Sequence, residues 1–179
     1  FLGRFHQKKG CEIIIETIYK IKDKINFYIL LAGPFTGSNY EKKIKAKVIE
    51  LKLQKRIFFS NALYNDLKWG SILASKGMIL PSHGENFGIS LAESLSLGKP
   101  VITTNKVNIA NDIIKYKAGL ISNNNTSSFS KKLFEFDNLS KSKLSKMSNN
   151  CLGCFKDNFD LAYNKKSLVK LLIKKQNNE

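Results

Sequence analysis

The sequence predicts an α/β domain built on a doubly wound parallel β-sheet, and two observations carry this prediction. Short apolar runs alternate along the chain with longer amphipathic stretches of helical period, which is the pattern of strands joined by crossover helices. Runs in the middle of the chain, Met78-Ile79-Leu80 and Val101-Ile102-Thr103, are nearly continuous in apolar residues. Strands covered by helices on both faces have this composition. The pattern therefore favours a doubly wound sheet over a barrel or a sandwich.

Strands and helices are expected in alternation up to residue 122. The expected strands are 1–2, 26–32, 56–60, 77–81, 100–104 and 118–122. The expected helices between them are 10–22, 39–53, 63–75, 87–97 and 109–116. After Asn123-Asn124-Asn125 the strand pattern stops. We expect 126–136, 141–155 and 161–175 to be closing helices with lysine-rich outer faces.

The chain of 179 residues is expected to form one domain, because no Gly/Ser/Pro-rich linker divides it. Its opening residues, Phe1-Leu2-Gly3-Arg4, resemble the end of a strand already begun, so we expect the first strand to be truncated. No stretch approaches the roughly 20 apolar residues that cross a bilayer, and no secretory signal pattern opens the chain. These features predict a cytoplasmic protein.

The formal net charge is +16 and the sequence pI is about 9.8. Such a charge suits a phosphate-rich partner or an anionic membrane surface. Arg4 and Arg56 are the only arginines, whereas nucleic-acid readers use arginine's planar fork and stacked aromatic residues. Biased codon usage is an equal explanation of the lysine excess.

Cys11, Cys151 and Cys154 form an odd set of cysteines. The last two have the spacing of a metal or redox pair, but no second pair or nearby histidine would complete a zinc site. We expect buried thiols in a reducing compartment.

In an open parallel sheet, ligands bind beyond the carboxyl ends of the strands. The loop after the opening strand, residues 3–10, carries Arg4 and Lys9, and such a pair can hold a diphosphate. Both cations would bind more strongly as a leaving nucleoside diphosphate gains negative charge. A solvated basic loop is the structural alternative.

A second loop, residues 81–88, runs from a buried strand into a helix. Gly88 at the start of that helix lets a phosphate approach free backbone N–H groups. Glu85 and Glu93 bracket this point, and a carboxylate accepts hydrogen bonds from paired hydroxyls. A phosphate cradle between two carboxylates suits a ligand with a sugar at each end. Alternatively, Ser82 to Glu85 and Ser90 to Glu93 have the Ser-x-x-Glu spacing of helix caps.

These residues resemble glycosyltransferase family 4, the large family of retaining enzymes with the GT-B fold. The core of the resemblance is Glu85, Phe87-Gly88, Glu93 and Gly98-Lys99-Pro100-Val101. The matching segments, in the family's order, are GRFHQKKG, ILLAGP, RIFFSNAL, ILPSHGENFGISLAESLSLGKPVITT and AGLI. The resemblance implies a Rossmann-like C-terminal donor-binding domain over residues 1–179, which is one half of a GT-B fold.

The resemblance also implies a role for each site residue. Arg4 and Lys9 would hold the donor diphosphate, with Lys8 as the alternative lysine. The other implied contacts are Glu93 with the ribose hydroxyls, Glu85 with the transferred sugar, and the backbone at Phe87 and Gly88 with the phosphates.

The implied reaction transfers a sugar from a nucleoside-diphosphate sugar to an acceptor hydroxyl with retained configuration. The resemblance implies no cofactor and no catalytic metal, with the basic pair taking the role of a divalent ion. The family's N-terminal acceptor domain is not in this sequence, so we expect the chain to bind donor but not to turn over alone.

Two alternatives remain at this point. A basic α/β module could bind nucleic acid or anionic membrane through its lysines, and a GT-B epimerase or phosphorylase shares the fold without the joint set of motifs. The lysine-rich closing helices also suggest peripheral contact with the inner membrane face.

Overall fold

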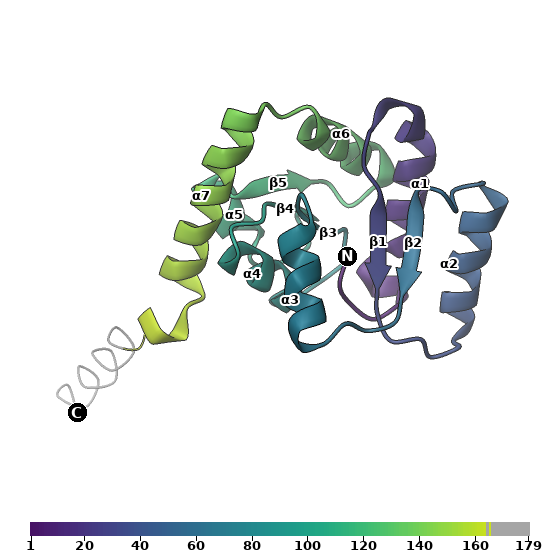
Figure 1. The fold of residues 1–179 in the computed structure, drawn as a ribbon, viewed down its shortest axis with the longest axis horizontal. Helices are drawn as coiled ribbons and strands as arrows, with labels where there is room; N and C mark the ends of the chain where they lie inside the picture. The colour runs from purple at the N-terminus through teal and green to yellow at the C-terminus, as the bar shows by residue number, and fades with distance from the viewer. Residues whose placement is uncertain (164, 166–179) are drawn as a thin grey trace.

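The computed structural model describes residues 1–163 and 165, and its frame consists of parallel strands with helices packed around them (Figure 1). The strands are β1 (Ile29–Ala32), β2 (Ile57–Ser60), β3 (Met78–Leu80), β4 (Val101–Thr104) and β5 (Gly119–Ser122). The helices are α1 (Cys11–Ile21), α2 (Asn39–Glu50), α3 (Asn65–Ala74), α4 (Ile89–Ser96), α5 (Ala110–Tyr116), α6 (Thr126–Asp137) and α7 (Lys141–Asn158), with short 3-10 turns at η1 (Gln7–Lys9) and η2 (Lys22–Lys24).

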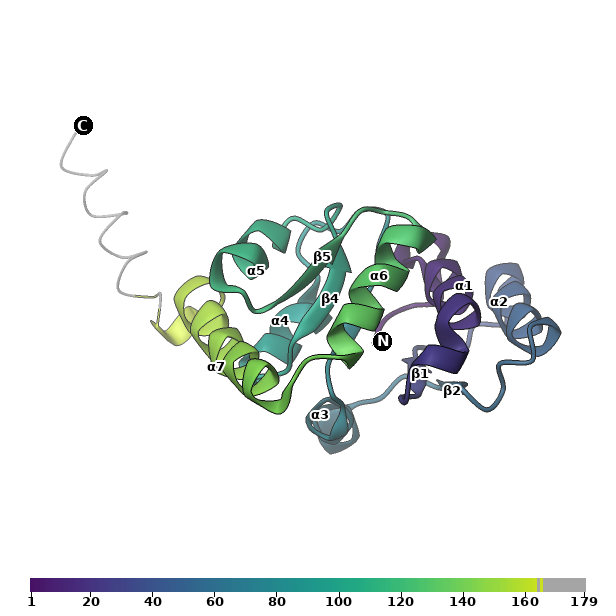
Figure 2. The ribbon, with the colours of Figure 1, turned by 90° about the horizontal axis from the view of Figure 1, so that it is seen from above.

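The parallel strands fall into two hydrogen-bonded sets. β1 pairs with β2, and β3, β4 and β5 pair in that order. Residues 1–3 run beside β1, where Leu2 forms a parallel bridge with Ala32. The N-terminus accordingly lies between the two sets of strands in both views (Figures 1 and 2). The predicted α/β class with parallel strands is confirmed, as is the extended pairing of the first residues.

Apolar residues at helical spacing join the two sets through α1 and α6. Ile14 and Ile18 on α1, with Phe129 and Leu133 on α6, are fully or almost fully buried. Each pair is four residues apart and so lies on one face of its helix. The two helices pack side by side (Figure 2), and this contact forms the middle of the core.

Several elements are shorter than the sequence predicts. The strand expected at 26–32 begins at Ile29, because residues 25–28, between η2 and β1, have no regular secondary structure. The helix expected at 63–75 begins at Asn65, which has a φ of 46°. Two closing helices are confirmed as α6 and α7. The third, expected at 161–175, falls mostly outside the described residues.

The cysteines are buried free thiols, as expected. Burial raises the pKa of Cys11 and Cys151 to about 12 and that of Cys154 to about 11, so all three are protonated near neutral pH. No helix in the described part of the chain has the length and apolar character that crossing a membrane requires.

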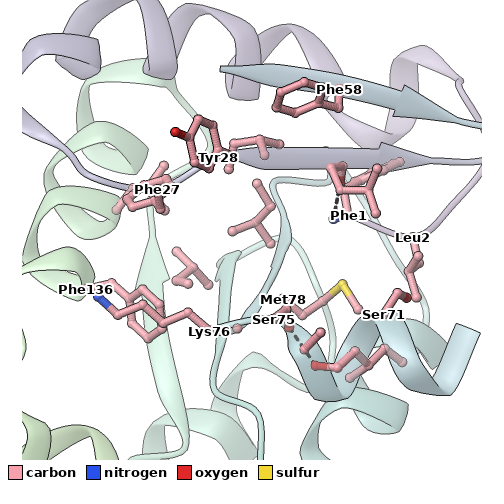
Figure 3. Close-up of a pocket in the computed structure, with 18 residues that line it drawn as sticks. Phe1, Leu2, Phe27, Tyr28, Phe58, Ser71, Ser75, Lys76, Met78 and Phe136 are labelled. Carbon is pink, nitrogen blue, oxygen red and sulfur yellow. Dashed lines mark hydrogen bonds between the residues drawn. The ribbon is translucent and has the colours of Figure 1, made fainter. Parts of the chain in front are cut away.

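A cavity of about 520 Å³ separates the two sets of strands at their amino ends (Figure 3). Its walls include Leu30 of β1, Ile79 of β3 and Ile72 of α3. The Phe1 amino group lies at this gap and donates a hydrogen bond of 2.9 Å to the carbonyl of Leu30. Burial lowers the pKa of this amino group from 8.0 to about 5.

This buried amino group predicts a pH-dependent stability for the 179-residue polypeptide. The amino group binds fewer protons when folded than when unfolded between pH 5 and 8, so stability should rise with pH across that window. Three pKa units correspond to about 4 kcal/mol in the free energy of unfolding. Urea unfolding at pH 5 and pH 8 measures this, and an N-acetylated chain should lack the dependence. Identical pH profiles for the free and acetylated chains would refute the prediction.

Candidate functional site

The loops that carry the predicted site residues lie at the carboxyl ends of the strands. One loop leaves the extended residues 1–3, a second leaves β3, and a third leaves β4. Parallel strands bring these ends to one edge of the frame, opposite the edge where the cavity lies. The cavity is therefore not the candidate site.

Hydrogen bonds join the first two loops directly. The carbonyl oxygen of Lys8 accepts from the Ser82 hydroxyl and from the His83 backbone N–H, each at 2.8 Å. Gly10 packs against the start of the second loop, where an added Cβ would lie 2.0 Å from the Pro81 carbonyl oxygen. Its φ of 71° also favours glycine. The two loops therefore form one unit.

The predicted cation and carboxylate of these loops meet across this junction. Lys9 Nζ donates to Glu85 Oε2, and each side chain is about a fifth exposed. Lys8 is exposed, and its Cε lies beside Gly84. Of the two lysines considered, the structure pairs Lys9 with the second loop. The cap interpretation of Glu85 is wrong, because the Ser82 hydroxyl bonds to Lys8 and Gly84 instead of to a helix end.

Two helices begin at this edge without a side-chain cap. α4 starts after Gly88, whose φ is 83°, and α1 starts after Gly10. The first N–H groups of a helix have no partner within the helix, and the helix dipole favours an anion beside them. Phe87 is 41% exposed next to Gly88 and meets Phe159 edge-on, with ring centroids 5.4 Å apart. The start of α4 is therefore the backbone site for negative charge at this edge, because Gly10 and Cys11 at the start of α1 are buried.

Glu93 lies inside α4 and pairs with a lysine from a different element. Lys68 Nζ on α3 donates to Glu93 Oε1 at 2.7 Å, and both side chains are about a quarter exposed. The cap interpretation of Glu93 is also wrong, since the N-cap of α4 is Gly88 rather than Ser90. Sequence reasoning missed Lys68, because nothing distinguishes it from the chain's many other lysines.

The loop after β4 is a second feature that sequence reasoning missed. The backbone N–H of Glu85 donates to the carbonyl of Lys106 at 3.1 Å, and the N–H of Asn108 donates to the carbonyl of Glu85 at 3.1 Å. Thr104 Oγ1 donates to the carbonyl of Ser82 at 2.6 Å. These bonds join the second loop, at Ser82 and Glu85, to the end of β4 and the loop that follows it.

Arg4 is exposed on the first loop. Within residues 1–163 and 165, no hydrogen bond or ion pair engages its guanidinium. It follows residues 1–3, which end beside the carboxyl end of β1, so it stands at the same edge as Lys9 and the start of α4. The predicted arginine and glutamates therefore lie at one edge of the sheets.

The protein-family model described as "Glycosyl transferases group 1" matches residues 1–151 of this chain. The chain belongs to this family. Among relatives, it is 33% identical over 99 residues to the O-antigen biosynthesis glycosyltransferase WclY of Escherichia coli, a match covering 55% of this chain and 26% of that protein. The chain spans about a quarter of the length of the first curated relatives it matches.

Solved structures of group 1 and related glycosyltransferases share the fold. The C-terminal domain of the group 1 protein LpcC from Francisella tularensis superposes with a TM-score of 0.76 at 19% identity, covering 89% of this chain and 84% of that one. Anabaena Alr3699/HepE in complex with UDP gives a TM-score of 0.81 at 17% identity, covering 97% and 48%. The predicted Rossmann-like half of a GT-B fold is confirmed.

The contact between Gly10 and Pro81 gives a test of the loop junction. Gly10→Ala adds an overlap with a backbone carbonyl to the strain of a positive φ, so it should lower the free energy of unfolding by about 2–5 kcal/mol. Gly37 has a similar φ of 67° but no atom within 4 Å of an added Cβ. Gly37→Ala should therefore cost only about 1 kcal/mol. Equal losses in chemical denaturation would show that the loops are not in tight contact.

Proposed function

We propose that this chain binds a nucleoside-diphosphate sugar as the donor half of a retaining glycosyltransferase. In the whole protein, the sugar passes from this donor to an acceptor hydroxyl. The observation that supports the proposal most directly is the meeting of Lys9, Glu85 and the uncapped start of α4 at one edge. Cations and backbone N–H groups suit a diphosphate, and the carboxylates suit the sugars on either side of it.

In the proposed complex, Lys9 exchanges its carboxylate partner for the diphosphate. Hydrogen bonds to charged groups are worth about 1.5–3 kcal/mol each, so a phosphate oxygen replaces the carboxylate oxygen as an acceptor of the same kind. Arg4 joins Lys9 at the phosphates, and Glu85, once free, accepts hydroxyls of the transferred sugar. The backbone at Phe87 and Gly88 meets the phosphates at the start of α4.

Glu93 is proposed to accept the ribose hydroxyls, and Lys68 to position it. The ammonium group of Lys68 holds Oε1, which leaves Oε2 available to a hydroxyl donor. Because Lys68 lies on α3 and Glu93 on α4, their pairing also brings α3 to the nucleoside end of the site. Lys68 is thus a positioning residue, not one that contacts the reacting atoms.

Catalysis in this proposal is mostly charge stabilisation and orientation. As the bond from the sugar to the phosphate breaks, negative charge grows on the departing diphosphate, and Arg4 and Lys9 stabilise it in place of a divalent ion. The departing phosphate accepts the proton of the incoming hydroxyl on the same face of the sugar, so the configuration is retained. No cofactor takes part.

The acceptor site is proposed to belong to a separate N-terminal domain, so that residues 1–179 bind donor without turning it over. Exposed lysines on α7, namely Lys141, Lys143, Lys146 and Lys156, suit peripheral contact with an anionic cytoplasmic membrane face. Such contact would bring the enzyme to a lipid-linked acceptor of polysaccharide or glycolipid synthesis.

Calorimetric titration with UDP and UDP-glucose tests donor binding, with GDP- and ADP-sugars as alternatives. UDP is the first probe because HepE was solved with it. Arg4→Ala should weaken binding about 10- to 100-fold through the loss of charged hydrogen bonds to phosphate. Glu93→Ala should weaken UDP by at least about tenfold but leave 2′,3′-dideoxy-UDP, which has no ribose hydroxyls, almost unchanged.

Lys42→Ala, an exposed change on α2, is the matched control and should leave binding unaltered. If chains with and without the Glu93 carboxylate bind equally, and affinity instead falls steeply with salt, the chain is a polyanion binder. Failure of every nucleoside-diphosphate sugar to bind would reject the donor site.

Substitutions of Lys68 separate positioning from simple charge. Lys68→Met should reduce the preference for UDP over its dideoxy analogue several-fold, because Glu93 loses the group that orients it. Lys68→Arg should restore much of the preference. A uniform loss for both ligands, with the preference intact, would mean that Lys68 acts only through its charge.

A further inference from the structure

The turn that leads into α4 is hydrogen-bonded through its backbone at its two ends but not between them. The N–H of Glu85 donates to the carbonyl of Lys106, and the carbonyl of Gly88 accepts the first hydrogen bonds of α4. Within residues 1–163 and 165, no hydrogen bond engages the backbone N–H or C=O of Asn86 or of Phe87. The backbone at Phe87 lies at the proposed phosphate site, so side-chain packing has to hold it in place.

The ring of Phe87 packs against Phe159, which stands where α7 ends. The two rings meet edge to face, with an interplanar angle of 88° and centroids 5.4 Å apart, and aromatic pairs favour this arrangement. Phe159 is half-buried and packs against the hydrophobic core, whereas Phe87 is exposed. Phe159 is therefore the more firmly placed of the two rings, and it holds Phe87 against the domain.

Helix α7 gives Phe159 a fixed position because it contacts α4 at both ends. The two helices pack side by side and run in opposite directions (Figure 1). In the first half of α7, Ser148 Oγ donates to the carbonyl of Gly98, just past the end of α4, at 2.5 Å. At the other end of α7, Phe159 reaches Phe87, just ahead of the start of α4. The fully buried Cys151 lies between these two contacts along α7.

The chain changes direction directly after Phe159. The N–H groups of Phe159 and Asp160 both donate to the carbonyl of Phe155, at 2.8 and 3.0 Å, and these bonds end α7. Asp160 Oδ1 then accepts the N–H groups of Ala162 and Tyr163, at 2.9 and 3.2 Å, in the manner of a helix N-cap. The position of Phe159 therefore determines where the turn capped by Asp160 begins.

We propose that Phe159 is a positioning residue for the phosphate-binding turn, and that its contact with Phe87 couples the donor diphosphate to the end of α7. The proposal rests on the donor-binding function proposed above. A diphosphate at the start of α4 needs the backbone at Phe87 and Gly88 in one conformation, and the Phe159 ring favours that conformation by holding Phe87. Coupling between two sites is reciprocal, so a bound diphosphate also stabilises the turn capped by Asp160.

The first test needs no nucleotide. Phe159→Ala should lower the NMR order parameters of the backbone N–H groups of Phe87 and Gly88 from about 0.85 toward about 0.6, because the supporting ring is gone. The hydrogen-bonded N–H of Glu85 should stay as ordered as in the parent chain. Phe134→Ala, which removes an exposed ring on α6, is the matched control and should change none of these values. Unchanged order at Phe87 in the Phe159→Ala chain would overturn the proposal.

Nucleotide titration provides the second test. Phe159→Ala should weaken UDP binding about two- to tenfold, the range that one aromatic pair supports, and leave the binding of uridine, which has no phosphate, unchanged. Phe159→Tyr keeps the ring and should restore UDP binding. Phe159→Leu keeps apolar packing at the end of α7 and should be intermediate, so it serves as the test variant if the alanine chain does not fold.

Amide exchange measures the coupling in the opposite direction. In the parent chain, UDP but not uridine should slow exchange at the N–H groups of Ala162 and Tyr163 about two- to tenfold, since both bond to the capping carboxylate of Asp160. This protection should disappear in Phe159→Ala and persist in Phe134→Ala. Exchange that UDP leaves unchanged in the parent chain would reject the coupling.

The outcomes separate this coupling from donor binding itself. Equal losses of UDP and uridine binding in Phe159→Ala would mean that Phe159 acts only on the stability of the domain, and they would overturn the proposal. Equal UDP affinity in the parent and Phe159→Ala chains would overturn it as well. If no nucleoside diphosphate binds the parent chain, the donor-binding function fails, whereas the order of Phe87 in the free chain still decides whether Phe159 positions this turn.

Discussion

The carbonyl oxygen of Lys8 is the point on which the ligand-facing edge depends. It accepts the Ser82 hydroxyl and the His83 N–H together, so a loop from the start of the chain is fixed to a loop some 70 residues later. Glycine fits at position 10 because a Cβ there would overlap the Pro81 carbonyl oxygen. With the two loops joined, the start of α1, the start of α4, Lys9 and Glu85 occupy fixed positions relative to one another.

Two of the chain's many lysines form ion pairs with the two carboxylates at this edge. Lys9 pairs with Glu85, and Lys68 pairs with Glu93. Partly exposed pairs of this kind contribute little to stability, but they keep each carboxylate at the edge and near a cation. The remaining lysines lie largely on outer helix faces, where they act on solubility and on long-range attraction of anions. The net charge alone therefore says little about the ligand.

The amino ends of the same strands form an apolar edge. There the two sets of strands are separated by an apolar cavity, and α1 and α6 provide the main packing between them. Residues 1–3 pair with β1, and the loop of Arg4 and Lys9 that follows them is fixed to the loop after β3 through the Lys8 carbonyl.

Local patterns in the sequence determined most of the fold and the identity of the site loops. Apolar runs such as Met78-Ile79-Leu80 specify buried strands, and glycines such as Gly88 mark helix starts, because strand burial and positive φ depend on residues close in sequence. The helix ends were less predictable, since packing decides where a helix frays. Only the tertiary structure decided that Lys9 rather than Lys8 meets Glu85, that Lys68 holds Glu93, and that the strands form two sets. These contacts join residues 25 to 76 positions apart, and in a lysine-rich chain no local pattern selects one ammonium group over another.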